Sequence, residues 1–509
     1  MKKLIAILLS CLFMLSGLSA LAETDTHYTY TATYVNRNAT EEDDFYHAIC
    51  DRFNIDIEPI GLAWASIPEI NSVMITGGTM YDIMMIPNNY GLVRSYAEQG
   101  LLKALPDGWR ETYPNIARAF EKGGVGDLFD LDGQTYAIPN INQMNFTEGG
   151  YCLSVTNAYY RADWAKELGF DFGASVTLSE FTEYLKACIE NDMAGNGQTI
   201  GLSTPYVEEI INLYKNINQL GEFAMGSEGK YIWGPQAEGT VEGIKAVKQL
   251  YQDGLIDPDF FTLDVFAGQN KFASGLSAAT YCTIGASNLT LIVANATEAG
   301  IQDAKEKFRP IVVTDDEGAY HVSEVANFNW CHVFSPEMDD EKFARWLSVY
   351  DFMFTEEYEL MRNLGLEGVD WDKQDDGSYV SYLSDEYDTI KAKYPSMWYF
   401  IDQCVFSTDF ENINPAYDAD ILAANYAVQE ERMKLTAEKG YTHIDPNILF
   451  LNTEAYSNYS VDIASEVARI IVDDSISIDD VEAEWEGFIK ANAGIWQPVV
   501  DDLNKLLEG

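Results

Sequence analysis

The amino-terminal part of the chain alternates between strand-like and helix-like patterns of apolar residues. Residues 28–35 are built from aromatic and β-branched residues in strict alternation, which predicts a strand. Thr40 is then expected to cap a helix in which Phe45, Ile49 and Phe53 form one apolar face. The chain therefore begins with a strand followed by an amphipathic helix.

The alternation of predicted strands and helices continues over the next 40 residues. Residues 56–60 predict a second strand, and residues 67–75 predict a helix that stops at Gly77 and Gly78. Residues 81–86 predict a third strand, which ends at a proline. This βαβαβ order is typical of a parallel sheet with helices on both faces.

Amphipathic helices recur further along the chain. Thr177 and Glu180 form a capping box at the start of one helix, and residues 241–251 carry an apolar stripe at helical spacing. Ser477 and Asp480 begin a late helix. A chain of this length with this alternation most simply forms two α/β lobes. Ligands of such sheets bind at the carboxyl ends of the strands, here in the cleft between the lobes.

The negative net charge of the chain disfavours some classes of binding partner. The protein has 509 residues, with 81 acidic against 32 basic residues and a net charge of −49. Nucleic acids and anionic membranes need basic surface, so both are disfavoured as partners. Aromatic residues make up 13% of the chain, which suits a protein that holds its ligand by ring contacts as well as one that only packs rings inside.

The first 22 residues read as an export signal. Two lysines precede an apolar stretch that is too short to span a bilayer, where about 20 residues are needed, and Ala20-Leu21-Ala22 supplies a cleavage site before Glu23. As an alternative interpretation, the residues that end at Cys11 loosely resemble a lipoprotein cleavage motif, and cleavage there would leave Cys11 lipidated. The mature protein is therefore expected in the periplasm or on the cell surface, with a lipid anchor left open.

Motifs for chemistry are absent from the sequence. The histidines show no metal-binding spacing, and the neighbours Cys331 and His332 are read as structural because adjacent strand residues point to opposite faces. With so many acids, any carboxylate pair for a glycosidase can be chosen by hand. The six cysteines after the signal are scattered and expected to be mostly buried thiols, with one or two disulfides left open.

Several phrases in order along the chain resemble the bacterial extracellular solute-binding proteins (family 1) of ABC transporters, in particular their large lipoprotein-like branch linked to carbohydrate uptake. Each phrase alone is weak evidence for this family, but the order of the phrases over residues 75–371 is specific to it. The phrases are ITGGTMYDI (75–83), QGLL (99–102), YPNI (113–116), DGQTYAIP (132–139), RADW (161–164), LYQDGLIDP (250–258), FASG (272–275) and GLEGVDW (365–371).

The resemblance implies a periplasmic-binding-protein type II fold, in which two lobes, each a mostly parallel sheet flanked by helices, are joined by a hinge. The first lobe would take residues 24–147 and 320–405, and the second lobe residues 148–319 and 406–509. It also implies a monomeric, non-catalytic protein without cofactor that closes on a solute and delivers it to membrane permease subunits. We expect an oligosaccharide as the solute, with a peptide or another polar solute as the alternative. A secreted polysaccharide hydrolase or lyase is the competing class.

One loop departs from the family pattern. Larger members often carry a calcium loop, and residues 192–201 match it at Asp192 and Asn196. Ala194 stands where an oxygen ligand is needed, and calcium takes about 6–8 oxygens. We therefore predict no metal here and read the glycines as a turn.

The candidate solute-binding residues follow expected strand ends or hinge crossings. A sugar presents apolar C–H faces and a hydroxyl rim, so its site needs flat rings together with amide or charged partners. For each tryptophan the alternative is a place in the core, and for the Asn pair a plain turn. The candidates are Asn36, Arg37, Trp64, Asn88, Asn89, Asn140, Asn142, Trp233, Trp330, Trp398 and Tyr399.

Overall fold

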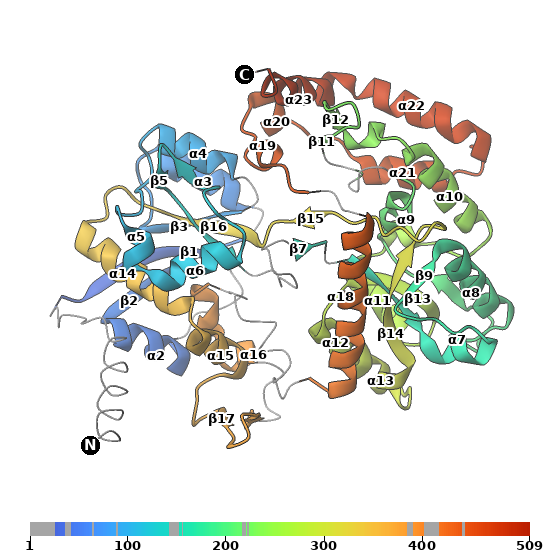
Figure 1. Cartoon of the computed structure of the whole chain (residues 1–509), viewed down its shortest axis with the longest axis horizontal. Helices are drawn as coiled ribbons and strands as arrows, with labels where there is room; N and C mark the ends of the chain where they lie inside the picture. The colour runs from blue at the N-terminus through green and yellow to red at the C-terminus, as the bar shows by residue number, and fades with distance from the viewer. Residues whose placement is uncertain are drawn as a thin grey trace, which may run out of the picture.

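The computed structural model shows two α/β lobes joined by crossing segments (Figure 1). Each lobe is built around its own five-stranded sheet. Both lobes draw on stretches of chain that lie far apart in the sequence. The structure describes residues 26–35, 42–63, 66–87, 90–141, 152–154, 156–215, 220, 223–383, 390–401, 417–439 and 443–508.

The first lobe contains the parallel sheet that the sequence predicts. Strands β1 (Tyr28–Val35), β2 (Ile55–Leu62) and β3 (Ile83–Pro87) run parallel, with β1 in the middle. The late strand β16 (Phe328–Phe334) runs antiparallel between β3 and β6 (Ile138–Ile141). The predicted βαβαβ order is confirmed, and a segment from nearly 200 residues further on completes the sheet.

The first helix begins at a different cap from the one predicted. Thr40 lies outside the described residues, and Asp43 is the N-cap of α2 (Asp44–Phe53). The Asp43 carboxylate accepts hydrogen bonds from the backbone N–H groups of Phe45 and Tyr46, which satisfies two of the free donors at the helix start. The choice of Thr40 was therefore wrong, although the predicted apolar face is buried.

Further helices and two hairpins complete the first lobe. Helix α3 ends at Gly77, as predicted. The elements are α3 (Ile67–Thr76), α4 (Gly91–Glu98), α5 (Trp109–Thr112), α6 (Pro114–Lys122), α14 (Asp340–Met353), α15 (Glu356–Leu364), α16 (Ile390–Lys393), η4 (Pro395–Tyr399), the hairpin β4 (Asp130–Leu131) and β5 (Gln134–Thr135), and the hairpin β17 (Trp371–Lys373) and β18 (Tyr379–Ser381).

The second lobe is built on a mixed sheet. Its strands lie in the order β10 (Ile200–Leu202), β13 (Ser277–Thr283), β8 (Thr156–Arg161), β14 (Phe308–Thr314) and β9 (Ser175–Thr177). Only β8 runs against the others. The carboxyl ends of β10, β13, β14 and β9 therefore meet at the edge where β8 begins.

The three later helices that the sequence predicts are all present in the second lobe. The capping boxes at Thr177 and Ser477 are formed, each by a partner carboxylate three residues on. The helices of this lobe are α7 (Ala162–Leu168), α8 (Leu178–Glu190), α9 (Glu208–Asn212), α10 (Thr240–Gln252), α11 (Val265–Ala273), α12 (Ala286–Glu298), α13 (Ala304–Lys307), α18 (Ala419–Lys439), α19 (Pro446–Leu449), α20 (Glu454–Ser457), α21 (Ile463–Val472), α22 (Val481–Ala491) and α23 (Ala493–Lys505). Short pieces are η2 (Gly234–Gln236), η3 (Phe260–Thr262), η5 (Ile478–Asp480), β11 (Phe223–Met225) and β12 (Tyr231–Trp233).

Two chain crossings pair with each other between the lobes. Strand β7 (Cys152–Leu153) lies antiparallel to β15 (Glu324–Val325) in a two-stranded ribbon (Figure 1). Next to this ribbon, the guanidinium of Arg432 on α18 donates to the backbone oxygen of Ser154 and to the Tyr320 hydroxyl. One buried side chain therefore ties together the segments that run into and out of the ribbon.

A second contact between the lobes lies away from the ribbon. Phe450, just after α19, packs its ring against Tyr90 and Phe129 of the first lobe, with ring centroids 6.1 and 5.5 Å apart. The next residue, Leu451, is buried in the core of the second lobe. Gly91 lies directly under this segment, where an added Cβ would come within 2.7 Å of the Phe450 oxygen.

The buried thiols of the described cysteines agree with the sequence. Cys50, Cys188, Cys282 and Cys331 are free and buried, as expected for most of the cysteines. Cys404 and the segment 1–25, with its export signal and Cys11, lie outside the described residues. In the part of the chain that the structure describes, no helix is both long and apolar enough to cross a bilayer.

Candidate functional site

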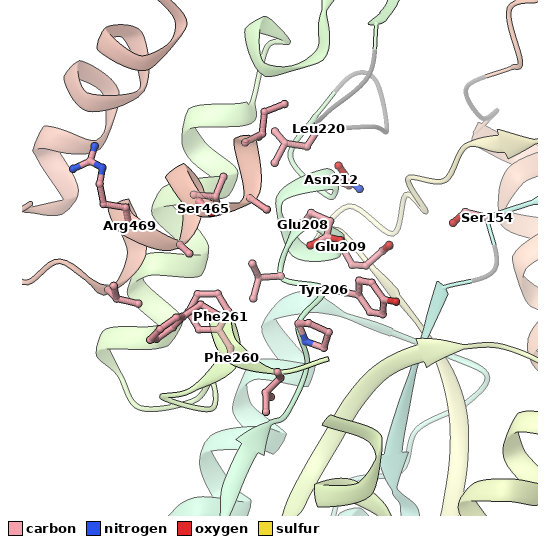
Figure 2. A pocket seen from close by; sticks show the side chains of 18 of the residues that line it. Ser154, Tyr206, Glu208, Glu209, Asn212, Leu220, Phe260, Phe261, Ser465 and Arg469 are labelled. Carbon is pink, nitrogen blue, oxygen red and sulfur yellow. The ribbon is translucent and has the colours of Figure 1, made fainter. Parts of the chain in front are cut away.

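A cavity of about 840 Å³ opens at the carboxyl edge of the second sheet. The chain leaves β10 at Leu202 and runs through Pro205 and Tyr206 into α9, which forms one wall. Helix α21 and η3 form the opposite wall (Figure 2). Because α/β sheets bind ligands at this edge of their strands, the position itself marks a candidate binding site.

The cavity also touches the crossing segments between the lobes. Ser154, directly after β7, and the residues 321–323, directly before β15, complete its lining. All of the described lining belongs to the second lobe or to these crossings. A ligand held here would therefore contact the segments about which the lobes are joined.

Aromatic rings supply much of the apolar lining. The rings of Phe260 and Phe261 lie on one side of the cavity and the ring of Tyr206 lies nearer the sheet (Figure 2). Phe261 is 52% exposed, so about half of this residue is available to a ligand. Exposed flat rings of this kind can stack on the C–H face of a sugar or receive a cation.

Two consecutive carboxyl groups project from α9 into the same space (Figure 2). Burial raises the pKa of Glu208 from its ordinary value to about 7. Burial, reinforced by the neighbouring charge of Glu208, raises the pKa of Glu209 to about 8, against a smaller opposing effect of Arg432. Near neutral pH the two carboxyl groups are therefore less ionised than exposed glutamates, and their oxygens accept hydrogen bonds in either state.

Asn212 adds a buried acceptor to this wall. Its side chain is 8% exposed, and its Oδ1 has no hydrogen-bond partner among the described residues. A buried acceptor without a partner is costly, and such atoms are rare in folded proteins unless a ligand or water satisfies them. Asn212 Oδ1 therefore needs a hydrogen-bond donor that the described residues do not supply.

The basic groups of the lining are already engaged. The guanidinium of Arg469 points away from the cavity (Figure 2) and pairs with Glu466 and Glu484 at 2.6 and 2.7 Å. The ring nitrogens of His321 lie 2.9 Å from the Lys215 oxygen and 2.9 Å from the Asp315 carboxylate. The described lining therefore offers rings, hydroxyl groups and carboxyl groups, and no unengaged cation.

Six of the eleven residues predicted to bind solute lie outside the described residues. These are Asn36, Arg37, Trp64, Asn88, Asn89 and Asn142. The described strands that precede them, β1, β2, β3 and β6, all end at the edge of the first sheet where β16 begins. Their role stays a prediction.

The other five predicted residues do not line the cavity. Trp233 is fully buried, where its indole N–H donates to the Tyr459 hydroxyl at 2.7 Å and its ring stacks on Trp496 at 5.5 Å. This is the core placement that the sequence left open for each tryptophan. Asn140 and Tyr399 are also buried, and Trp330 and Trp398 are half-buried in the first lobe.

The residues that line the cavity were missed by sequence reasoning. Tyr206, Glu208, Glu209 and Asn212 follow a strand of only three residues, which is too short to stand out by alternation. The available signal was Pro205, which ends an apolar run and commonly marks the loop after a strand. The two glutamates were indistinguishable in sequence from the other acids.

The degenerate calcium loop is closed by its own hydrogen bonds. One carboxylate oxygen of Asp192 accepts from the Gly197 N–H at 2.8 Å, and the other accepts from the Thr199 hydroxyl at 2.9 Å. The Gly197 and Thr199 donors hold the pKa of Asp192 below its usual range. Gly195 and Gly197 adopt positive φ, as the turn requires.

We expect that calcium does not stabilise this loop. Adding CaCl2 or a chelator should leave the Tm unchanged, because the donors of the loop already satisfy the Asp192 oxygens. Asp192→Ala should lower the Tm equally with and without calcium, since it removes both hydrogen bonds. A Tm that rises with CaCl2 in the wild type and not in Asp192→Ala would contradict this expectation.

Cys331 and His332 lie in the core, as the sequence predicts. Burial lowers the pKa of His332 to about 3, so its ring is neutral. Its ring lies 4.7 Å from that of Trp330 and 5.7 Å from that of Tyr350. The pair therefore has a packing role in β16.

Sequence comparison gives partial matches to two curated bacterial proteins. No protein-family model matches the chain. It is 25% identical over 207 residues to lipoprotein LipO of Bacillus subtilis, covering 38% of each chain. It is also 25% identical over 183 residues to the fructooligosaccharide ABC transporter substrate-binding protein FusA of Streptococcus pneumoniae, covering 33% of each. The matches therefore span about a third of the length of these curated relatives.

Structural comparison covers almost the whole chain. The alginate-binding protein AlgQ2 without calcium superposes with a TM-score of 0.64 at 18% identity, covering 95% of this chain and 98% of that one. An HMO-binding solute-binding protein of Bifidobacterium longum infantis gives 0.63 at 16%, covering 94% and 98%. FusA of S. pneumoniae with kestose gives 0.60 at 15%, covering 93% and 99%. The chain therefore has the two-lobed fold of the solute-binding proteins of ABC transporters, as the resemblance of its sequence phrases implies.

Proposed function

We propose that this protein is the extracellular solute-binding component of an ABC importer. It captures an oligosaccharide in the cleft between its lobes and delivers it to membrane permease subunits. The observation that carries the proposal is the cavity at the carboxyl edge of the second sheet, next to the paired crossings β7 and β15. The shared fold with proteins whose names describe alginate, HMO and kestose as ligands supports it.

Closure would bring the first lobe over this cavity. We assign residues 24–147 and 320–405 to the first lobe and residues 148–319 and 406–509 to the second, with the β7–β15 ribbon as part of the hinge. The strand ends of the first sheet that precede the predicted Asn and Trp residues would supply the opposite wall of the cleft. A solute bridging both walls would favour the closed arrangement by its differential affinity.

Solute binding is favoured over catalysis. An oligosaccharide is also favoured over other classes of solute. Glu208 and Glu209 are adjacent on one short helix, whereas a glycosidase needs two carboxyl groups that flank the scissile bond. A peptide or another polar solute is the alternative cargo, since rings and acceptors suit both. We further propose that the protein is exported, acts as a monomer at the cell surface or in the periplasm, and needs no cofactor.

A ligand screen with a parallel turnover assay tests the proposed function. The chain from Glu23 onward is scanned thermally against oligosaccharides and peptides, and each well is checked for product. A solute that binds only the folded state should stabilise it by about 2.7 kcal/mol at 100 times its Kd. We expect a rise in Tm with one class of sugar and no product.

The same screen contains the outcomes that contradict the proposal. Product formation from any glycan would replace capture by hydrolysis or cleavage. A Tm that rises with peptides alone would keep the importer and change the cargo. As a control, Phe261→Ala should weaken binding with little change in the Tm of the unliganded protein, because this ring is half exposed in the cavity.

A further inference from the structure

The described lining of the cavity carries two carboxyl groups without a matching cation. Glu208 and Glu209 face the cavity from α9, Asn212 on the same helix has a buried amide oxygen without a partner, and the basic side chains of the described lining are held elsewhere. A molecule that fills the space must therefore satisfy acceptors. It must also lie beside two carboxyl groups for which the described residues supply no ion-pair partner.

We infer that the cavity selects its solute by charge: it takes groups that donate hydrogen bonds and carry no negative charge, namely sugar hydroxyls or ammonium groups, and it rejects uronate-type carboxylates. This inference rests on the proposed function and names the class of solute for the same site. The Oδ1 of Asn212 and the carboxyls of Glu208 and Glu209 receive the donors. A solute carboxylate would meet these oxygens without a compensating cation from the described lining, and burying a charge without a partner weakens binding.

The titratable groups that face the acid pair come from its own segment, from β13, from the segment before β15 and from α18. They are Tyr206, Tyr281, Tyr320, His321 and Arg432. Arg432 acts on Glu209 while its own donors are given to Tyr320, Gln429 and Ser154. Arg469 on α21 points away from the cavity (Figure 2) and is paired with Glu466 and Glu484. None of the basic groups of the described lining is therefore available to a carboxylate of the solute.

A matched set of oligosaccharides tests the inference. The probes are a β-1,4-linked glucose tetrasaccharide, its glucosamine counterpart and its glucuronate counterpart, together with the same three forms of whichever sugar raises the Tm in the screen. Isothermal titration at pH 7 should give a Kd for the uronate form at least about 100-fold weaker than for the neutral form. The glucosamine form should bind at least as tightly as the neutral one.

Isosteric variants assign the discrimination to the cavity. Glu208→Gln with Glu209→Gln keeps the shape of the wall and removes its capacity for negative charge, so the preference against uronate should fall at least about 10-fold. Glu183→Gln, on the exposed face of α8, removes one charge far from the cavity and should change nothing. The preference should persist in 0.5 M NaCl, which screens the long-range field of an acidic protein.

A measurement without ligand checks the state of the acid pair. The pKa values of Glu208 and Glu209 are raised from an ordinary value of 4.5, so the folded state holds more protons than the unfolded state. Their contribution to stability is full below pH 4.5 and is lost as the pH rises through about 7 and 8. The Tm of the wild type should therefore fall between pH 5 and pH 8 relative to that of the double Gln variant.

The outcomes separate this inference from the proposed function. Uronate binding as tight as that of the neutral form, or discrimination that vanishes in salt or survives in the double Gln variant, overturns the charge selection and leaves solute capture intact. Parallel Tm profiles of the wild type and the double Gln variant also count against it. If no sugar of any charge binds, both proposals fail together.

Discussion

Trp233→Ala should lower the free energy of unfolding by about 4 kcal/mol, because it removes a fully buried ring that nothing nearby can replace. The ring stacks on Trp496 with an interplanar angle of 12° and packs against Phe488. The substitution also takes from the Tyr459 hydroxyl the indole N–H that donates to it. Chemical denaturation monitored by far-UV circular dichroism measures this loss.

Trp233→Phe separates a structural role from a ligand-binding role. This variant keeps most of the apolar volume, so the protein should fold and bind solute with an unchanged Kd. Phe261→Ala is the matched contrast, since it should weaken binding while leaving stability nearly unchanged. A stable Trp233→Phe protein that had lost affinity would return Trp233 to the binding site.

Arg432→Met should cost about 3 kcal/mol of stability, the second large effect that we expect. Arg432 is 2% exposed and donates to Tyr320 and Gln429, each at 3.0 Å, and to the backbone oxygen of Ser154. Methionine fills much of the volume and satisfies none of these acceptors. Urea denaturation of the full chain is the measurement.

Arg469→Met is the control for the loss of an arginine charge. Its side chain is 43% exposed, and its pairs with Glu466 and Glu484 lie at the surface, where such pairs contribute at most about 1 kcal/mol. Equal losses of stability in Arg432→Met and Arg469→Met would show that the buried position of Arg432 next to the crossings adds nothing to the effect of losing an arginine. Arg432→Lys should resemble Arg432→Met, because one ammonium group cannot reach all three acceptors.

The parts of the fold that depend on neighbours in sequence were predictable. Strand β1 stands out by strict alternation, and the capping boxes at Thr177 and Ser477 are formed as the sequence indicates. The error at the start of α2 is local as well, since Thr40 and Asp43 are both good N-caps, and the contact of Asp43 with Ser396 on η4 is a tertiary one. Sequence alone could not supply that contact.

The candidate site was harder to predict because it depends on what burial does to ordinary residues. Glu208 and Glu209 are two acids among many until the walls of α21 and η3 close around them and raise their pKa values. Trp233 shows the opposite case. It has the residue type expected of a sugar platform, and the packing of β12 against α23 buries it. Residue type alone predicted neither the place of Glu208 and Glu209 in the cavity nor the place of Trp233 in the core.

The place of β16 determines the order in which the two sheets can form. All five strands of the second sheet lie between residues 156 and 314, so a chain growing from its amino terminus contains that sheet before it contains residue 328. Among the described strands of the first sheet, β16 is the only neighbour of β6 and joins it to β3. Closing so long a loop slows folding, and until it closes β3 presents an unpaired edge. The lobe that begins the sequence is therefore the one whose sheet is completed last.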